Sequence, residues 1–304
     1  MNISKKALMS FLMTLTSLIA MAQPYYHVMK QDGNKLTEEA MYDSKNYKIR
    51  VDMVPAEEKP KDAIGGKISI LRYDCDISGL KRSFYFTKNG NVYYSFGKKK
   101  FFFASSQTDV HTYYNDDKNY GSCAHFQRGR TLADCIDWDG SPTPFGNSET
   151  DFYFTDPKNL PKLQEDLGNE RWAVLSYCEW DFVMRTLGEA GWSIGVRSNC
   201  FVIDTTPGKS LLKAIKKENK SPYSKSMTWQ QFKKYEAQGL VCLSASGYRE
   251  ERAVKGGDRT GNYWSCTPYG WNKTWTMRFG MTSCILDNEW NSTGHAVRLV
   301  ILAD

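Results

Sequence analysis

The sequence lacks the patterns on which most enzymes and nucleotide-binding proteins depend. Its 304 residues include four histidines, and no G-x-S-x-G, P-loop or H-E-x-x-H pattern occurs. No two of the eight cysteines have the C-x-x-C spacing of a zinc site. Asp137 and Asp139 flank Trp138, but the surrounding residues are typical of a turn with outward-facing carboxylates. We therefore predict a protein that is not an enzyme, with no catalytic residues, no cofactor and no metal.

Charge and hydropathy argue against two further classes of partner. The net charge is +6, and without Lys5 and Lys6 it falls to +4, a balance that is not typical of nucleic-acid binding. The lysine runs at 98–100 and 213–220 are interpreted as solvated turns or helix faces. After residue 22, no apolar run approaches the length of a membrane span. We expect neither nucleic-acid binding nor a membrane span in the mature chain.

The N-terminus has the three zones of a secretory signal peptide. Lys5 and Lys6 precede an uncharged apolar stretch of about fifteen residues at 7–21, and Ala20-Met21-Ala22 is a small-x-small cleavage site. A membrane anchor or a buried helix is the alternative, but the stretch is short for a bilayer span. No cysteine follows this stretch to carry a lipid anchor. The sequence thus predicts cleavage of residues 1–22 and export to the periplasm, the cell surface or the extracellular space.

Aromatic residues make up 14% of the chain, a content that argues for a folded protein rather than a disordered one. In an exported protein, eight cysteines permit up to four disulfides with about 105 connectivities, so the sequence leaves the pairing open. Cys123 and Cys135 flank a loop-like segment and are the first candidates for a pair. Cys178, Cys200 and Cys242 lie in apolar segments, which is typical of buried thiols.

The chain divides into an N-terminal extension and a main domain. Residues 23–54 alternate weakly and predict two short strands around a turn at Asp32-Gly33-Asn34. Proline, charge and a glycine pair at 55–66 predict a linker, so that 23–64 is an extension with its linker and 65–304 is one domain. Residues 67–103 contain four strand-like runs, and 104–168 read as a long irregular region.

Two helices are predicted by their capping boxes. The first begins after Ser176, with Glu179 at the third position, and the second begins after Thr228, with Gln231 at that position. Apolar and aromatic residues follow at helical spacing, which is typical of core faces. Strand-like runs then return, without βαβ alternation or internal repeats. The sequence predicts an α+β fold, with two helices packed on antiparallel strands.

Several segments resemble a family of secreted Bacteroidetes proteins. RWAVLS through Glu179-Trp180 is similar to the family element W-R-x-L-T-x-x-E-W, and GNYWS at 261–265 to G-x-Y-W-S. GHAVRLV at 294–300 is similar to the closing element G-x-S-V-R-L-V, with Ala296 where serine is usual. Residues 84–94, 101–110 and 227–250 also resemble elements of this family, and the six elements occur in the family's order. The chain therefore resembles the Fibrobacter-type major paralogous domain over about residues 67–304.

This resemblance implies a C-type-lectin-like fold more firmly than it implies a function. The same fold carries formylglycine-generating enzymes, bacterial adhesins and the variable proteins of diversity-generating retroelements. Cys266 and Cys284 are the C-terminal cysteines, but their surroundings do not match the formylglycine-generating motif. The calcium-dependent sugar site of such lectins uses a carboxylate–Pro–amide triplet and a Trp-Asn-Asp element, and neither occurs here. Binding in this fold usually falls between the second helix and the last strand.

That stretch is rich in aromatic residues, which supply large and rigid contact area in binding surfaces. Trp264 and Trp275 fall within predicted strands and are assigned to the core, although all the aromatic residues could instead pack the sheet. The candidate ligand-binding residues lie on predicted turns and are Tyr269, Trp271, Asn272, Asp287, Asn288, Trp290 and Asn291.

The sequence thus favours a non-catalytic recognition protein that binds a glycan or a surface protein. One alternative is a structural subunit of a surface or fimbrial assembly, joined through residues 23–54 as a strand added to the sheet of another chain. A second alternative is a retroelement-diversified binding protein, which a single sequence cannot distinguish.

Overall fold

The structure is a computed structural model. It describes residues 26–32, 35–42, 47–72, 83–95, 100–109, 122–123, 125–126, 165–168, 170–250, 253–269 and 273–303. The predicted signal peptide, Cys135 and most of the predicted irregular region lie outside these residues. Contacts divide the chain into two units, Met1–Tyr47 and Lys48–Asp304, and each is described by itself.

The first unit contains a β-hairpin. Strands β1 (Tyr26–Asp32) and β2 (Lys35–Tyr42) pair antiparallel, with Asp32 opposite Lys35 at the predicted turn. The sequence placed the second strand of this pair at 47–53, and the structure corrects that assignment. Residues 47–52 form β3 (Tyr47–Asp52), whose partner is β4 in the larger unit. Strand β2 was missed because KLTEEAMY has no alternation of apolar and polar residues.

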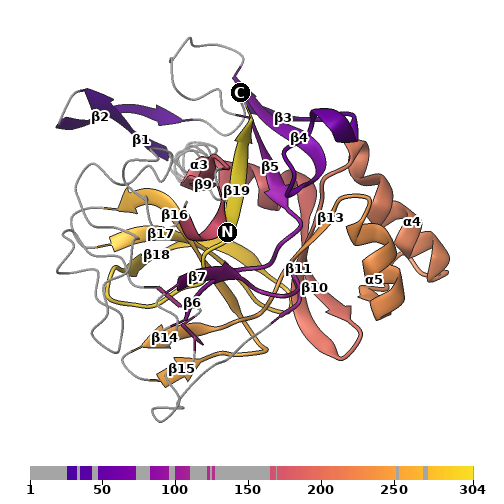
Figure 1. Cartoon of the computed structure of the whole chain (residues 1–304). Helices are drawn as coiled ribbons and strands as arrows, with labels where there is room; N and C mark the ends of the chain where they lie inside the picture. The colour runs from indigo at the N-terminus through magenta and orange to yellow at the C-terminus, as the bar shows by residue number, and fades with distance from the viewer. Residues whose placement is uncertain are drawn as a thin grey trace, which may run out of the picture. The chain divides into compact units, whose positions relative to one another are not determined.

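A five-stranded sheet joins the two ends of the second unit (Figure 1). Its order is β3-β4-β5-β19-β9, with β4 (Ala63–Arg72), β5 (Ser83–Thr87), β9 (Trp172–Val174) and β19 (Leu299–Ala303). Strand β19 pairs antiparallel with β5 on one side and with β9 on the other. The last strand of the chain therefore lies beside an early strand. Residues from both ends of this unit therefore form one sheet.

The segment predicted as a linker instead connects two neighbouring strands of this sheet. Residues 55–66 contain a short 3-10 helix, η2 (Ala56–Glu58), and the first residues of β4. Gly65 has φ +68°, and a Cβ there would lie 1.7 Å from Oγ1 of Thr205. The Gly66 amide donates to the Thr205 carbonyl at 3.0 Å. The glycine pair therefore permits close backbone approach, and the unit boundary lies at 47–48 rather than near 64.

A four-stranded sheet carries two helices on one face. Its order is β12-β10-β11-β13, with β10 (Gly188–Ile194), β11 (Arg197–Asp204), β12 (Ser226–Met227) and β13 (Leu240–Leu243). Helices α4 (Ser210–Glu218) and α5 (Trp229–Glu236) pack their apolar sides on it, so that Ile215 and Phe232 share a buried cluster with Val202. Cys200 and Cys242 belong to the same cluster as free thiols, which confirms two of the predicted buried cysteines.

Both predicted capping boxes are confirmed. Helix α3 (Tyr177–Phe182) has Ser176 as its N-cap, and α5 has Thr228. Each hydroxyl accepts from the third backbone amide of its helix, and each N-cap amide donates to the side chain of that third residue, Glu179 or Gln231. A turn of π-helix, η3 (Val183–Leu187), continues α3. One part of the prediction was wrong: Trp229, assigned to the core, is 43% exposed. It is the first residue of α5, ahead of Phe232 and Tyr235, which pack on the sheet.

Helix α4 was not predicted, because its cap comes from outside its own sequence. Its N-cap residue, Lys209, is left-handed and makes no side-chain cap bond. Asp204, at the end of β11, instead accepts from the Leu212 amide at 2.9 Å and from the Thr206 amide at 2.9 Å. The turn between them contains a short 3-10 segment, η4 (Pro207–Lys209). A carboxylate eight residues upstream is invisible to a local capping motif.

Three small antiparallel sheets complete the described fold. Strands β6 (Val92–Ser95), β7 (Lys100–Phe103) and β8 (Ser122–Cys123) form one, and β14 (Tyr248–Glu250) and β15 (Ala253–Lys255) form a second. The third has the order β16-β17-β18, with β16 (Gly261–Tyr269), β17 (Lys273–Phe279) and β18 (Cys284–Trp290). The chain is thus a mixed protein of many strands and few helices. None of the helices in the described part is long and apolar enough to cross a membrane.

One short segment before β19 contacts several of these sheets. His295 exchanges backbone bonds with Phe126, and the Ala296 carbonyl accepts from the amide of Trp264 in β16. The Val297 carbonyl accepts from the amide of Val92, the first residue of β6. Residues 294–298, which we call the seam, therefore connect β6 and β16 to the five-stranded sheet. This is the segment that resembles the closing family motif.

The seam ends in a fully buried arginine. Arg298 has no exposed area, and its Nη2 donates to Oε1 of Gln107 at 2.8 Å and to the Thr87 carbonyl at 2.9 Å. Gln107 also accepts from the Cys242 amide at 3.1 Å and donates to Oε1 of Glu236 at 3.0 Å. Burial lowers the pKa of Arg298 to about 10. One glutamine side chain thus links the seam to β13 and α5.

Replacing Gln107 should therefore destabilise the protein strongly. Gln107→Leu keeps the approximate volume but removes the acceptor of a buried guanidinium and of the Cys242 amide, so we expect a loss of about 2–4 kcal/mol in unfolding free energy. Gln238→Leu, at an exposed glutamine beyond α5, should change it by no more than about 0.5 kcal/mol. Urea unfolding measures both, and equal losses in the two variants would contradict the role of Gln107.

Candidate functional site

The structure places the predicted binding residues on one sheet rather than on turns. Tyr269 is the last residue of β16, while Asp287, Asn288 and Trp290 belong to β18. Asn291 follows β18, and the predicted residues Trp271 and Asn272 lie outside the described residues. The polar letters of CILDNEW predicted a loop, but the whole of β18 pairs in register with β17. Pairing along this strand overrides the low strand propensity of Asp and Asn.

The three strands of this sheet, β16, β17 and β18, together present a row of side chains. Tyr269 lies opposite Lys273, and Lys273 lies opposite Trp290, so the three residues cross β16, β17 and β18 at one level. Tyr269 is 43% exposed and Trp290 is 50% exposed. The Lys273 ammonium lies 4.7 Å from the centre of the Trp290 ring and donates to Oδ1 of Asn288 at 3.2 Å. We call Tyr269, Lys273, Asn288 and Trp290 the aromatic row.

The aromatic row rests on a packed aromatic layer. Trp275, two residues beyond Lys273 on the same face of β17, meets the ring of Tyr269 edge-on, with centroids 4.9 Å apart. Tyr177, the first residue of α3, packs on Trp275 at 4.3 Å. Trp275 was assigned to the core, and its side chain is half-buried between these two rings. The helix therefore supports the row from beneath and leaves the two outer rings accessible.

Asp287, the acidic residue predicted for the same site, lies on the opposite face of β18. Alternation along the strand separates Asp287 and Glu289 from Asn288 and Trp290. Asp287 accepts from the Asn288 amide at 2.9 Å and lies 3.8 Å from Arg278, while partial burial raises the pKa of Glu289. Asn291 accepts from the Thr274 hydroxyl at 2.8 Å. The structure thus brings together Tyr269, Asn288 and Trp290 of the predicted set, and does not bring Asp287 to them.

These hydrogen bonds reduce the number of side-chain oxygen atoms that are free to bind a cation at this sheet. Calcium requires six to eight oxygen ligands, whereas the oxygens of Asn288 and Asn291 already accept from neighbouring side chains. In the described part of the chain, no three side chains of histidine, cysteine, aspartate or glutamate form a group suited to hold a metal.

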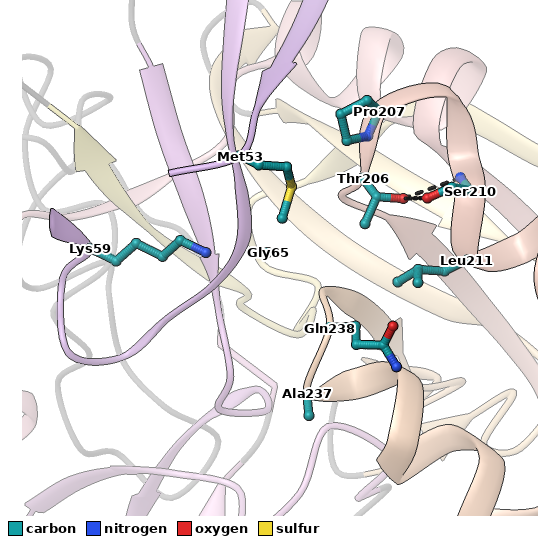
Figure 2. A pocket seen from close by; sticks show the side chains of 9 residues that line it. All are labelled: Met53, Lys59, Gly65, Thr206, Pro207, Ser210, Leu211, Ala237 and Gln238. Carbon is teal, nitrogen blue, oxygen red and sulfur yellow. Dashed lines mark hydrogen bonds between the residues drawn. The ribbon is translucent and has the colours of Figure 1, made fainter. Parts of the chain in front are cut away.

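A second candidate site is a pocket of about 410 Å³ that sequence reasoning missed. Figure 2 shows Met53 and Lys59 on one side of it and Pro207 and Leu211 on the other. Gly65, Thr206, Ser210, Ala237 and Gln238 complete the lining. Three segments far apart in the sequence form the pocket, so no local pattern predicts it. Its lining includes no histidine, cysteine or carboxylate, and Lys59 is its one charged side chain.

The two histidines whose side chains are described lie in the core. His125 and His295 are 2% and 1% exposed, and Trp264 packs edge-on against His295 at 4.4 Å. Nε2 of His125 bonds to the Ser246 carbonyl at 2.9 Å, and Arg249 donates to the His125 carbonyl at 3.0 Å. Burial, and then the Arg249 charge, lowers the pKa of His125 to about 3. Burial, and then His125, lowers the pKa of His295.

Comparison with known proteins matches one family model, described as a domain of unknown function (DUF8237), over residues 217–300. The matched range contains α5, the small sheets that follow it, the aromatic row and the whole seam. No curated protein and no solved structure matches the chain.

The buried histidine pair predicts a pH dependence of stability. Unfolded imidazoles take up a proton below about pH 6.5, whereas folded His125 stays neutral to about pH 3. The unfolded state therefore binds more protons in this window, and the unfolding free energy falls as the pH falls, by up to about 1.4 kcal/mol per pH unit for each histidine.

His125→Gln and His295→Gln test this dependence. Each variant should show a shallower slope than the wild type between pH 6 and about pH 4, when unfolding is followed in urea. The carboxylates contribute equally to the slopes of the wild type and of the two variants. The difference in slope between a variant and the wild type therefore isolates the contribution of one imidazole. Identical slopes would show that the histidines titrate alike in the folded and unfolded chains.

Proposed function

We propose that the protein is a non-catalytic, exported recognition protein that binds a glycan through the aromatic row. We further propose that residues 65–304 form a C-type-lectin-like domain related to the Fibrobacter-type major paralogous domain. The mixed fold supports this assignment, as does the pairing of the last strand with an early one. Export rests on the predicted signal peptide.

The observation that carries the proposal is the exposure of two large rings on a rigid support. Tyr269 and Trp290 stand two strands apart, on the order of 10 Å, and the sheet fixes their spacing. An aromatic ring offers a flat apolar surface at low entropic cost, and the apolar face of a sugar ring can stack on it. Lys273 and Asn288 place a cation and an amide between and beside the rings, where hydroxyl groups of a sugar could bond.

A protein ligand would use the same residues, since tryptophan and tyrosine are common interface anchors. The row is, however, about three strands wide and flanked by polar side chains. It is small beside the roughly 800 Å² that each partner of a stable protein complex buries. This limited area favours a saccharide of a few units over a folded protein.

Binding of the mature protein, residues 23–304, to a glycan array tests this function. Trp290→Ala should weaken the binding of a positive glycan at least about tenfold, which corresponds to about 1.4 kcal/mol. Ile285→Ala is the matched control, because Ile285 is 49% exposed on the opposite face of the same strand. Equal affinity of wild type and Trp290→Ala would place recognition elsewhere, and equal losses in both variants would indicate a general structural effect.

A structural role in a surface assembly is the second candidate, and the N-terminal hairpin favours it. Strands β1 and β2 form a compact unit of their own, and an isolated two-stranded hairpin is only marginally stable in water. Addition of this hairpin to the sheet edge of another chain would satisfy its free backbone groups.

This second candidate makes a separate prediction about oligomeric state. If the hairpin joins chains, residues 23–304 should form oligomers whose mass rises with concentration, and deletion of residues 23–46 should leave a monomer. Light scattering after size exclusion measures both. A monomer in both cases would remove the support for an assembly role.

A further inference from the structure

The net charge of the protein is concentrated on one face. Residues 209–238, which contain α4 and α5, include eight lysines and two glutamates, a net charge of +6. The whole chain also has a net charge of +6, so the remaining residues balance one another. The two helices lie side by side and cover one face of the four-stranded sheet, where they form an outer layer of the second unit (Figure 1). We call this surface the lysine face.

The nearby carboxylates already have partners. Glu189 pairs with Lys216 at 2.9 Å, Glu236 with Lys233 at 2.7 Å, and Glu218 with Lys234 at 2.8 Å. Hydrogen bonds from Lys234 and then Tyr235 lower the pKa of Glu218 to about 2. Each of these three glutamates is therefore already paired with one lysine.

Within 209–238, four exposed lysines make no ion pair with another described residue. Lys225 donates to the Ala190 carbonyl at 2.8 Å, and the other three are Lys213, Lys217 and Lys220. Lys213 and Lys217 are one helical turn apart on the solvent side of α4, a like-charged spacing that costs a helix a few tenths of a kcal/mol. The helix dipole favours cations in the last turn, which accounts for Lys216 and Lys217 but not for Lys213. The close spacing of these lysines thus has a local cost in free energy that the fold itself does not explain.

Burial of the apolar helix faces limits what can dock here. Leu211, Leu212 and Ile215 of α4 face the sheet, and so do Phe232 and Tyr235 of α5. These side chains are therefore unavailable to insert into a lipid surface, and Trp229 is the exposed aromatic residue of α5. An electrostatic partner that lies along α4 fits the charges, because Lys213 and Lys217 are about one 5.4 Å turn apart and Lys220 follows the end of the helix.

We propose that the lysine face binds an acidic polysaccharide, whose carboxylates meet Lys213, Lys217 and Lys220. This site lies on α4 and just beyond its last residue, whereas the aromatic row lies on β16, β17 and β18, and the site requires no residue of that row. A polymer with one charge per sugar unit can contact all three ammonium groups at once, and point charges on flexible stems adapt to its spacing. The contact should be strongly screened by salt.

Polygalacturonate is the probe, and the protein is the full mature chain. Calorimetry at about 0.05 M and about 0.3 M sodium chloride should show binding at the lower salt and a large loss at the higher. The variant Lys213→Gln/Lys217→Gln/Lys220→Gln should bind at least about tenfold more weakly than the wild type. Fully methyl-esterified polygalacturonate, which has lost its charge, should not bind.

A matched variant separates the site from net charge. Lys61→Gln/Lys88→Gln/Lys100→Gln removes the same number of charges from exposed positions outside the helices and should keep the affinity within about twofold. Trp290→Ala should also keep it, which distinguishes this surface from the aromatic row. Absence of wild-type binding, equal loss in both triple variants, or loss in Trp290→Ala would overturn the proposal. Tighter binding to phosphatidylglycerol vesicles or to duplex DNA would overturn the assignment to a saccharide.

Discussion

Burial of Arg298 is the constraint on which the rest of the structure depends. Nη2 of this buried guanidinium donates to Gln107 and to the Thr87 carbonyl, and these bonds offset part of the cost of burying the charge. Gln107 simultaneously bonds the edge of β13 and Glu236 of α5, so the arginine, the four-stranded sheet and the helical layer require one another. A change of register would break these hydrogen bonds and leave further polar groups of the network buried without partners.

The same constraint fixes the surface that we assign to binding. The residues just before Arg298 hold the start of β16, since Ala296 bonds on both sides of Tyr263. Strand β17 pairs with β16 on both sides of an irregularity between Trp264 and Pro268, and β18 pairs with β17 in continuous register. Tyr269, Lys273 and Trp290 occupy the far ends of these strands. Their spacing is therefore set by backbone pairing within the sheet.

Local signals predicted the local features of this fold. The capping boxes at Ser176 and Thr228 are short-range bonds, and the structure reproduces both. Helix α4 and the glycine pair at 65–66 depend on partners distant in sequence, so α4 was missed and the pair was taken for a linker. Tyr269 and Trp290 were predicted as site residues from their aromatic chemistry, and both lie in the aromatic row. Asp287 was predicted on a loop, but this segment is a strand that directs Asp287 to the opposite face. Lys273 was missed, because its position between the rings follows from register alone.

Nuclear magnetic resonance of the tryptophan indoles tests the central claim most directly. The mature protein is titrated with a soluble oligosaccharide that the array identifies, and each indole N–H is followed separately. Trp290, at 50% exposure in the row, should shift with ligand and saturate, while the buried Trp180, Trp192 and Trp264 should stay unchanged. Binding that leaves the Trp290 signal in place and moves other indoles would contradict recognition through the aromatic row.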